Sequence, residues 1–164
     1  MKKENLYEPN CIRTFTGLYM NVFDPTPEMI CIEDIAHALS MQCRFGGHLP
    51  KFYSVAQHSV NVADMSRTLQ ALMHDSAEAY LLDIPSPIKK RLTGYKEIED
   101  NLLRVIADKF GFDPILSEET KAADKVLLEF EWDTLMLRND TVWCWEPALA
   151  KDKFVSIFNI LFNR

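Results

Sequence analysis

The sequence has little of several features that would place it in a specialised class. Its 164 residues include only five glycines, and no apolar run approaches the roughly 20 residues that a membrane-spanning helix needs. The four cysteines are scattered without a CxxC pair, which argues against a cysteine zinc site or a disulfide framework. Positive charge is also scarce, because 18 Lys and Arg residues stand against 24 Asp and Glu residues. A broad duplex-binding surface is therefore not expected.

The composition predicts one soluble domain. A chain of 164 residues is long enough for one well-buried domain and short for two, so residues 1–164 are expected to fold as a single unit. Hydrophobic residues make up 48% and charged residues 26%, which is typical of soluble globular proteins. No apolar signal segment follows Lys2 and Lys3, so we expect a cytoplasmic protein without a membrane partner. Despite the net charge of -6, a few focused cations could bind a small anionic ligand.

Hydrophobic periodicity predicts an all-α fold, a helical bundle with a short N-terminal β-hairpin. The hairpin is expected over residues 12–23, where threonines and aromatic residues surround Gly17. Helices are expected over residues 31–39, 54–67, 72–83, 95–110, 118–138 and 152–162.

Apolar stripes predict which side of each helix faces the core. Ser54 is expected to cap the helix over 54–67, whose inward stripe is predicted to be Val55, His58, Val62 and Met65. In the helix over 118–138, the predicted apolar face is Val126, Leu127, Phe130 and Leu137. The last helix is predicted to form either a lid on the core or a dimer seam through Phe154, Ile157, Phe158 and Leu161. The dimer seam is one reason to expect a homo-oligomer.

Polar residues interrupt the apolar run over 72–83. In a helix, His74 and Glu78 are four residues apart and Asp75 and Glu78 are three apart, so the three side chains share one side of two turns. Burying carboxylates among leucines costs several kcal/mol unless a partner or an ion balances them. A cation held by His74 and Asp75 would provide that balance.

Two further polar residues lie on predicted inner faces. His58 belongs to the inward stripe of the helix over 54–67, and Asp124 lies near the inner edge of the helix over 118–138. Each has an ordinary alternative, because a buried histidine is usually a hydrogen-bonded core residue and an early helical aspartate is usually a surface carboxylate. With His74 and Asp75, however, they give the order H…HD…D across three predicted helices. This combination predicts a shared metal site.

Two loops carry cations. Arg44 and Phe45 begin a glycine-rich loop that ends at Pro50, and Lys89 begins a run of three cations. Each loop could simply be a solvated connector. Alternatively, the rigid proline turn over 84–87 would hold one cation, by position Lys89, over the carboxylates, where it could meet a phosphate.

The motifs resemble those of the HD-domain phosphohydrolases, metal-dependent all-helical enzymes whose signature is H…HD…D. The resemblance extends beyond the signature to Glu33–Ser40, Arg44–His48, Tyr53–Ser59, His74–Tyr80 and Asp83–Lys89. These segments are similar to the nucleotide-acting branch, which includes bacterial 5′-deoxynucleotidases and phage enzymes that strip phosphate or triphosphate from dATP. The resemblance covers about residues 12–138.

The resemblance implies a metal site and a proton handler. His58, His74, Asp75 and Asp124 would be the metal ligands, and Glu78 would activate a metal-bound water without being a ligand. Mixed imidazole and carboxylate sites accept zinc, cobalt, manganese or iron, so ligand type does not identify the metal. Magnesium could accompany the substrate phosphates.

The resemblance also implies substrate contacts. Arg44 and Lys89 match positions that bind substrate phosphate, where cations offset transition-state charge. Asp83 matches a catalytic position near the sugar and the reacting phosphate, although it could equally cap the proline turn. Phe45 could stack on the base or sugar, or it could be a core aromatic.

The implied function is hydrolysis of deoxynucleotides at the 5′ oxygen. A deoxynucleoside monophosphate would give nucleoside and phosphate, and a triphosphate such as dATP would give nucleoside and triphosphate. The positive charge over 89–91 favours a triphosphate slightly. Two alternatives stay open: a catalytically inactive HD-type regulator that binds nucleotides, and a helical partner-binding protein that uses Phe154 to Leu161.

Overall fold

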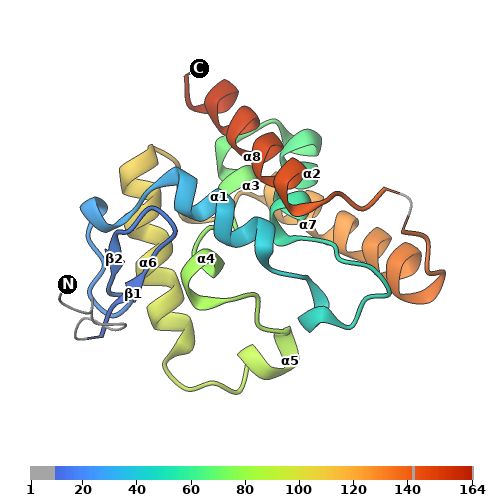
Figure 1. The fold of residues 1–164 in the computed structure, drawn as a ribbon, viewed down its shortest axis with the longest axis horizontal. Coiled ribbons are helices and arrows are strands. Elements are labelled where there is room, and N and C mark those ends of the chain that lie inside the picture. The colour runs from blue at the N-terminus through green and yellow to red at the C-terminus, as the bar shows by residue number, and fades with distance from the viewer. Residues whose placement is uncertain (1–9, 142, 164) are drawn as a thin grey trace, which may run out of the picture.

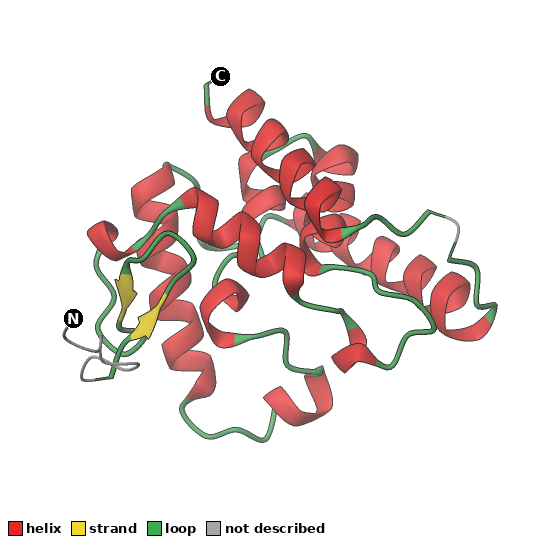
Figure 2. Cartoon of the chain, viewed as in Figure 1, coloured by secondary structure: helices red, strands yellow, loops and turns green. Residues whose placement is uncertain are grey.

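Helices make up most of the computed structural model, which describes residues 10–141 and 143–163 (Figure 1). In chain order they are α1 (Ile32–Met41), α2 (Val55–Ser66), α3 (Leu69–Met73), α4 (Glu78–Leu81), α5 (Ser86–Lys89), α6 (Tyr95–Phe110), α7 (Glu118–Glu131) and α8 (Pro147–Phe162). Short 3₁₀ turns occupy Pro27–Met29 and Phe45–Gly47, and a π-helical segment, Trp132–Leu137, continues α7. Over the described residues, strands form one hairpin (Figure 2). The predicted all-α fold with a short N-terminal hairpin is confirmed.

The hairpin is fixed to α1 by a buried carboxylate. Strands β1 (Ile12–Arg13) and β2 (Tyr19–Met20) pair antiparallel around a turn in which Gly17 has a φ of +94°. A left-handed φ of this kind is costly for residues with a Cβ atom. Asp34 of α1 accepts hydrogen bonds from the backbone N and the side-chain Oγ1 of Thr16, at 2.7 and 2.8 Å. The carboxylate thereby holds the turn against the helix.

Helix α2 lies at the centre of the bundle. It packs against α1, α3, α7 and α8, and nine of its twelve residues are buried. Ser54 caps it as predicted, because its Oγ accepts a hydrogen bond from the backbone N of Gln57 at 3.0 Å. Met65 is an exception to the predicted inward stripe, since it is 50% exposed near the end of the helix.

The predicted helix over 72–83 is broken into two pieces. Helix α3 ends at Met73 and α4 begins at Glu78, with a tight turn between them. In that turn, backbone hydrogen bonds run from Ser76 to Met73 and from Glu78 to Asp75, both at 2.9 Å. These bonds span three residues rather than four, so the chain is wound more tightly than an α-helix. A continuous helix was therefore the wrong prediction for this run.

Of the four residues predicted to form the apolar face of α7 and the segment that follows it, only Leu127 is buried. The buried residues of α7 are Thr120, Ala123, Leu127 and Glu131. Val126 and Phe130, which were expected to be inside, are 55% and 51% exposed, and Leu137 in the following π-helical segment is also exposed. The helix presents a partly polar side to α2 because Asp124 and Glu131 contact His58 there.

The last helix completes the core. It begins at Pro147, five residues before the predicted start, and packs against α1, α2 and α3. Phe154 and Phe158 are buried, and Phe158 meets Phe110 of α6 edge to face at 5.2 Å between ring centroids. The prediction of a core lid is confirmed, because Ile157 and Leu161 are also partly buried against the main apolar cluster.

Buried apolar side chains from α1, α2, α3, α6 and α8 join one main cluster, and Tyr53, Leu135 and Cys144 form a smaller one.

The described helices are too short or too polar to cross a bilayer. Lys2 and Lys3, on which the expected location partly depends, lie outside the described residues.

Candidate metal centre

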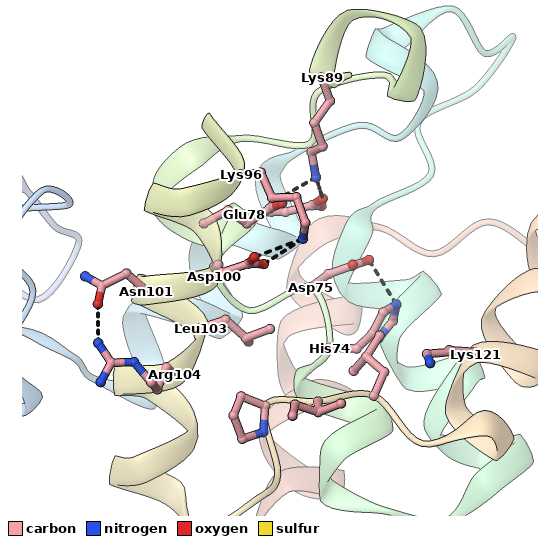
Figure 3. A pocket seen from close by; sticks show the side chains of 15 residues that line it. His74, Asp75, Glu78, Lys89, Lys96, Asp100, Asn101, Leu103, Arg104 and Lys121 are labelled. Atoms are coloured by element: carbon pink, nitrogen blue, oxygen red, sulfur yellow. Dashed lines mark hydrogen bonds and ion pairs between the residues drawn. The ribbon is translucent and has the colours of Figure 1, made fainter. Parts of the chain in front are cut away.

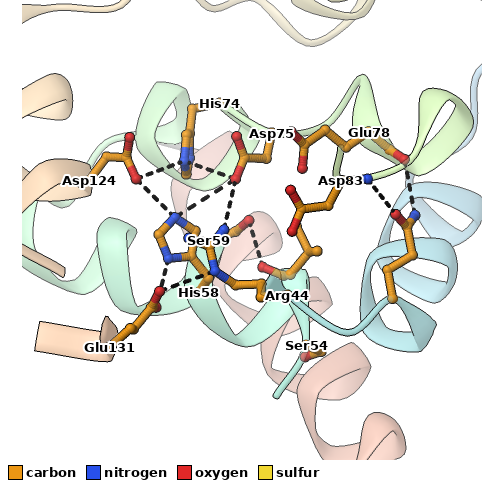
Figure 4. Close-up of polar contacts among 12 residues, drawn as sticks. Arg44, Ser54, His58, Ser59, His74, Asp75, Glu78, Asp83, Asp124 and Glu131 are labelled. Atoms are coloured by element: carbon orange, nitrogen blue, oxygen red, sulfur yellow. Dashed lines mark hydrogen bonds and ion pairs between the residues drawn. The ribbon is translucent and has the colours of Figure 1, made fainter. Parts of the chain in front are cut away.

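Two histidines and an aspartate meet beside the central helix (Figure 4). His58 lies within α2, His74 directly follows α3, and Asp75 is the next residue in the turn. One ligand atom from each lies within 4.8 Å of the other two. Both imidazoles are buried, whereas the Asp75 side chain is 20% exposed. We call these three residues the HHD group.

The orientation of His74 leaves one ring nitrogen available to a ligand. Its Nδ1 donates to the carbonyl oxygen of Ala71 at 2.7 Å. Its buried Nε2 makes no hydrogen bond, although it lies 3.2 Å from Oδ2 of Asp75. Burial lowers the pKa of His74, but the carboxylates of Asp75 and Asp124 outweigh burial and raise this pKa to about 9. The site therefore attracts positive charge, as a proton or as a metal ion.

Asp124 of α7 closes the group on a more exposed side. Its Oδ1 lies 3.0 Å from Nε2 of His58 and 3.8 Å from Nε2 of His74. Burial raises the pKa of Asp124, but the two histidines outweigh it and lower this pKa below its ordinary value. All four predicted ligands are thus adjacent, with three around one point and Asp124 in contact with both histidines.

The donor set fits a divalent first-row cation. Imidazole nitrogens and carboxylate oxygens are ligands that zinc, cobalt, manganese and iron share. The unpartnered Nε2 of His74 supports the fit, because a buried ring nitrogen without a hydrogen bond is otherwise unfavourable. The ring of His58 lies beside that of His74, with the two ring centroids 5.3 Å apart and Nε2 of His58 3.0 Å from Oδ1 of Asp124.

Sequence reasoning missed Glu131, a fully buried carboxylate at the end of α7. Its Oε1 accepts hydrogen bonds from Nδ1 of His58 at 2.8 Å and from the Tyr53 hydroxyl at 2.6 Å, and its Oε2 accepts from Nε of Arg44 at 3.1 Å. Metal-binding histidines commonly donate their other N–H to a carboxylate in this way. Spacing offered a signal, since Glu131 is two turns after Asp124 and shares its helix face.

Glu78 begins α4 and lies beside the HHD group without joining it. Its Oε1 pairs with Lys89 Nζ at 3.1 Å, and the same ammonium pairs with Glu99 of α6 at 2.7 Å. Burial and the nearby carboxylates of Asp75 and Asp83 raise the pKa of Glu78 to about 9, against the opposing effect of Lys89. A cation at the HHD group would lower this pKa, because it would favour the ionised carboxylate.

Arg44 and Phe45 lie on the other side of the group. Arg44 is buried, with its NH1 3.8 Å from Oδ2 of Asp75. Burial lowers its pKa, but Glu131 and Asp75 outweigh burial and keep it well above its ordinary value. Phe45 has a φ of +55°, an uncommon value for a residue with a side chain, and its ring lies 6.1 Å from that of Trp132. It is partly buried beside the guanidinium.

Asp83 belongs to the same polar region. Its backbone N donates to Oε1 of Gln42 at 3.0 Å, while Nε2 of Gln42 donates to the carbonyl of Glu78, also at 3.0 Å. Burial raises the pKa of Asp83, although Arg44 opposes this shift. Helix α5 has no side-chain cap, so the alternative in which Asp83 caps the proline turn is not observed.

A cavity of about 730 Å³ extends from His74 and Asp75 of the HHD group toward α6 (Figure 3). His74, Asp75, Glu78 and Lys89 line one end, and α6, Lys121 and residues 114–116 line the rest. Of the three cations over 89–91, only Lys89 lines this cavity, because Lys90 and Arg91 border a separate surface hollow. Arg44, Phe45 and Asp83 are not among the described residues that line it.

Comparisons with known proteins identify relatives that cover most of the chain. No family model matches the sequence. The uncharacterized protein YfdR of Escherichia coli is 39% identical over 153 residues, which cover 92% of this chain and 84% of YfdR. The chain belongs to the YfdR family. An uncharacterized protein of Rhodobacter capsulatus is 35% identical over 136 residues, 73% of this chain and 69% of that protein. The breadth of the YfdR match means that it spans the segments carrying the HHD group, Asp124 and Glu131.

Proposed function

We propose that the protein is an HD-type, metal-dependent phosphohydrolase that releases the nucleoside from a deoxynucleoside monophosphate or triphosphate, such as dATP. The observation that carries the proposal is the HHD group with Asp124 beside it. Residues from three separate segments, in the order H…HD…D, lie close together, and two of them, His74 and Asp75, line the end of a large cavity. Such a buried cluster of perturbed ionisable groups at a cavity is typical of a catalytic site.

The reaction needs a nucleophile and groups that stabilise the negative charge on the phosphoryl oxygens. A divalent cation bound by the HHD group would lower the pKa of a water molecule and stabilise negative charge on the phosphoryl oxygens. Water adds to phosphorus, the bond from phosphorus to the 5′ oxygen breaks, and that oxygen leaves with a proton as the nucleoside. Glu78 is suited to accept the proton from water, because its Oε2 is buried and has no hydrogen-bond partner.

Two cations flank the proposed reaction centre. Lys89 is held at the cavity by Glu78 and Glu99, within reach of an entering phosphate. Arg44 approaches Asp75 from the opposite side, with Nε bound by Glu131 and NH1 3.8 Å from Oδ2 of Asp75. Positive charge at both sides would offset the charge of the transferred phosphoryl group.

The cavity suits a nucleotide in size and lining. Ligand pockets commonly have volumes of about 300–1,000 Å³. Leu103 and Ile115 provide an apolar wall, and Lys96 and Lys121, which pair with Asp100 and Glu118, add two further cations to the lining. These lysines could bind the additional phosphates of a triphosphate. Lys90 and Arg91 could not, because they line a separate surface hollow.

The decisive experiment is a turnover screen. Purified protein is stripped with EDTA, reloaded with Mn²⁺, Co²⁺ or Zn²⁺, and incubated with every deoxynucleoside monophosphate and triphosphate. Chromatography identifies the nucleoside, and detection of phosphate or of triphosphate shows which group was removed from it. We expect metal-dependent release of nucleoside from at least one substrate; no turnover with any metal would rule out the proposed function.

Matched variants connect turnover to the site. His74→Ala and Asp75→Ala should abolish turnover, whereas Asp64→Ala should keep it, because Asp64 is exposed and is not among the described residues that line the cavity. Glu78→Gln should bind metal but lose most of its turnover. Equal turnover in Glu78→Gln and the parent protein would contradict the proton-accepting role.

A further inference from the structure

Glu131 forms hydrogen bonds to two parts of the proposed site, His58 and Arg44. It is wholly buried at the end of α7, and each of its oxygens serves a different side. Oε1 faces His58 and Tyr53, while Oε2 faces Arg44. One rigid group therefore contacts both a candidate metal ligand and a candidate phosphate-binding residue.

The contact with His58 determines which ring nitrogen faces the metal. A carboxylate oxygen can only accept, so Nδ1 of His58 carries the proton in the 2.8 Å hydrogen bond to Glu131. When a metal ion takes the place of a proton on the opposite nitrogen, Nε2 presents its lone pair toward Asp75 and Asp124, which lie 3.8 and 3.0 Å away. A hydrogen bond to the ring nitrogen that does not bind the metal fixes the tautomer and the orientation of a ligand ring.

The contact with Arg44 fixes the guanidinium beside the same group. Its Nε donates to Glu131, and its NH1 lies 3.8 Å from Oδ2 of Asp75. The guanidinium is planar, so fixing Nε also fixes the directions of its other N–H groups. A phosphate bound there would therefore have a defined position relative to the metal ligands.

Tyr53 holds the Glu131 carboxylate itself in place, and is not one of the two functional residues that Glu131 contacts. Its hydroxyl oxygen accepts from Nδ2 of Asn61 at 3.2 Å, which leaves its only hydrogen for Oε1 of Glu131 at 2.6 Å. With three donors satisfied, the buried carboxylate has little freedom to rotate.

We propose that Glu131 is a positioning residue that aligns the metal-binding nitrogen of His58 with the phosphate-binding face of Arg44. The Arg44 half rests on the proposed function, whereas the His58 half requires only that the HHD group bind a metal. The two halves make separate predictions, so each can fail by itself.

The first test measures binding without turnover. Mn²⁺ is titrated into the stripped protein by calorimetry, and inorganic phosphate is then titrated into the Mn²⁺-loaded protein. The isosteric Glu131→Gln variant cannot satisfy both sides, because its NH₂ group must oppose either the Arg44 N–H or the His58 N–H. We expect about a 10–100-fold loss of affinity for Mn²⁺ or for phosphate. Unchanged affinity for both would overturn the proposal.

A matched control uses the same helix. Glu129→Gln removes an exposed carboxylate whose contact with Lys125 is 3.9 Å long, so both affinities should stay within about twofold of the parent values. Tyr53→Phe keeps both functional contacts of Glu131 and should have a smaller effect than Glu131→Gln. A Tyr53→Phe effect as large as that of Glu131→Gln would indicate a general packing role instead.

The second test needs no variant. Nitrogen-15 histidine spectra of the Zn²⁺-loaded parent protein report which ring nitrogen of His58 is protonated and which binds metal. The proposal requires a protonated Nδ1 and a metal-bound Nε2, and metal on Nδ1 would refute it. A protein that binds Zn²⁺ in this way but hydrolyses no nucleotide would refute the proposed function while leaving the His58 half intact.

Discussion

Helices α2 and α7 both bring a candidate ligand to the metal centre, but they bury different kinds of surface. Helix α2 is enclosed on most sides, and His58 is one polar residue in a mainly apolar interior. Helix α7 is partly exposed, and the side it turns inward carries Asp124 and the buried Glu131, while Val126 and Phe130 face solvent. Position relative to the site, rather than hydrophobicity, determines which face of α7 is buried.

Removing a ligand from each helix tests this comparison most severely. His58→Ala should abolish measurable Mn²⁺ binding, because it removes a central ligand and leaves Glu131 without one donor. Asp124→Ala should weaken binding by at least about 10-fold but leave a measurable site, since its side chain is 37% exposed and water can replace its oxygen. Calorimetric titration checks both. Tighter binding by His58→Ala than by Asp124→Ala would reverse the assigned importance of the two helices.

The next effect concerns the stability of the metal-free protein. Glu131→Ala should lower the free energy of unfolding by about 3–5 kcal/mol, because it leaves the buried Arg44 charge without its closest carboxylate. Phe130→Ala, a larger deletion on the neighbouring position, should change it by no more than about 0.5–1 kcal/mol because the ring is half exposed. Urea denaturation measures both. Similar losses would mean that α7 is buried as hydrophobicity predicted.

A smaller effect compares the same residue type on the two helices. Val62→Ala on α2 should lower the free energy of unfolding by about 1–2 kcal/mol, because this side chain is completely buried. Val126→Ala on α7 should change it by less than about 0.5 kcal/mol. The measurement is again urea denaturation, and equal values for the two variants would remove the contrast between the helices.

The smallest expected effect is on acid stability. Burial raises the pKa of Glu131, but His58 and Arg44 outweigh burial, so the folded-state pKa lies below the ordinary value of 4.5. The unfolded chain therefore binds more protons near this pH, and the stabilisation from Glu131 is present above pH 4.5 and lost as pH falls through the folded pKa. Below pH 4.5, metal-free Glu131→Gln should lose stability less steeply than the parent protein. Parallel pH curves from thermal unfolding would contradict this assignment.

Sequence patterns predicted where the helices lie better than they predicted which side chains are buried and how tightly the chain is wound. Ser54 was a correct N-cap, and the spacing of Phe154 and Phe158 correctly indicated a buried side of the last helix. The tight turn after Met73 was missed because His74, Asp75 and their neighbours keep helical spacing in the sequence while hydrogen bonds shorten the turn. Local periodicity cannot report such a change of winding.

The candidate ligands were predictable because they form an ordered set, whereas their supporting partners do not. Glu131 looks like any charged residue of an exposed helix until its neighbours His58 and Arg44, far away in the sequence, are known. Glu99 was hidden for the same reason, since only the fold brings α6 against Lys89. Contacts between distant segments carry this information, and single-residue patterns do not.

The double pairing of Lys89 has a consequence for affinity. Its ammonium is already neutralised by Glu78 and Glu99, so an arriving phosphate would compete with an internal ligand. The fraction of protein in which Lys89 has left Glu78 would scale the apparent dissociation constant. Weak binding of the first phosphate would then reflect this exchange of partners rather than a poor fit, and the same exchange would free Glu78 at the moment a substrate is in place.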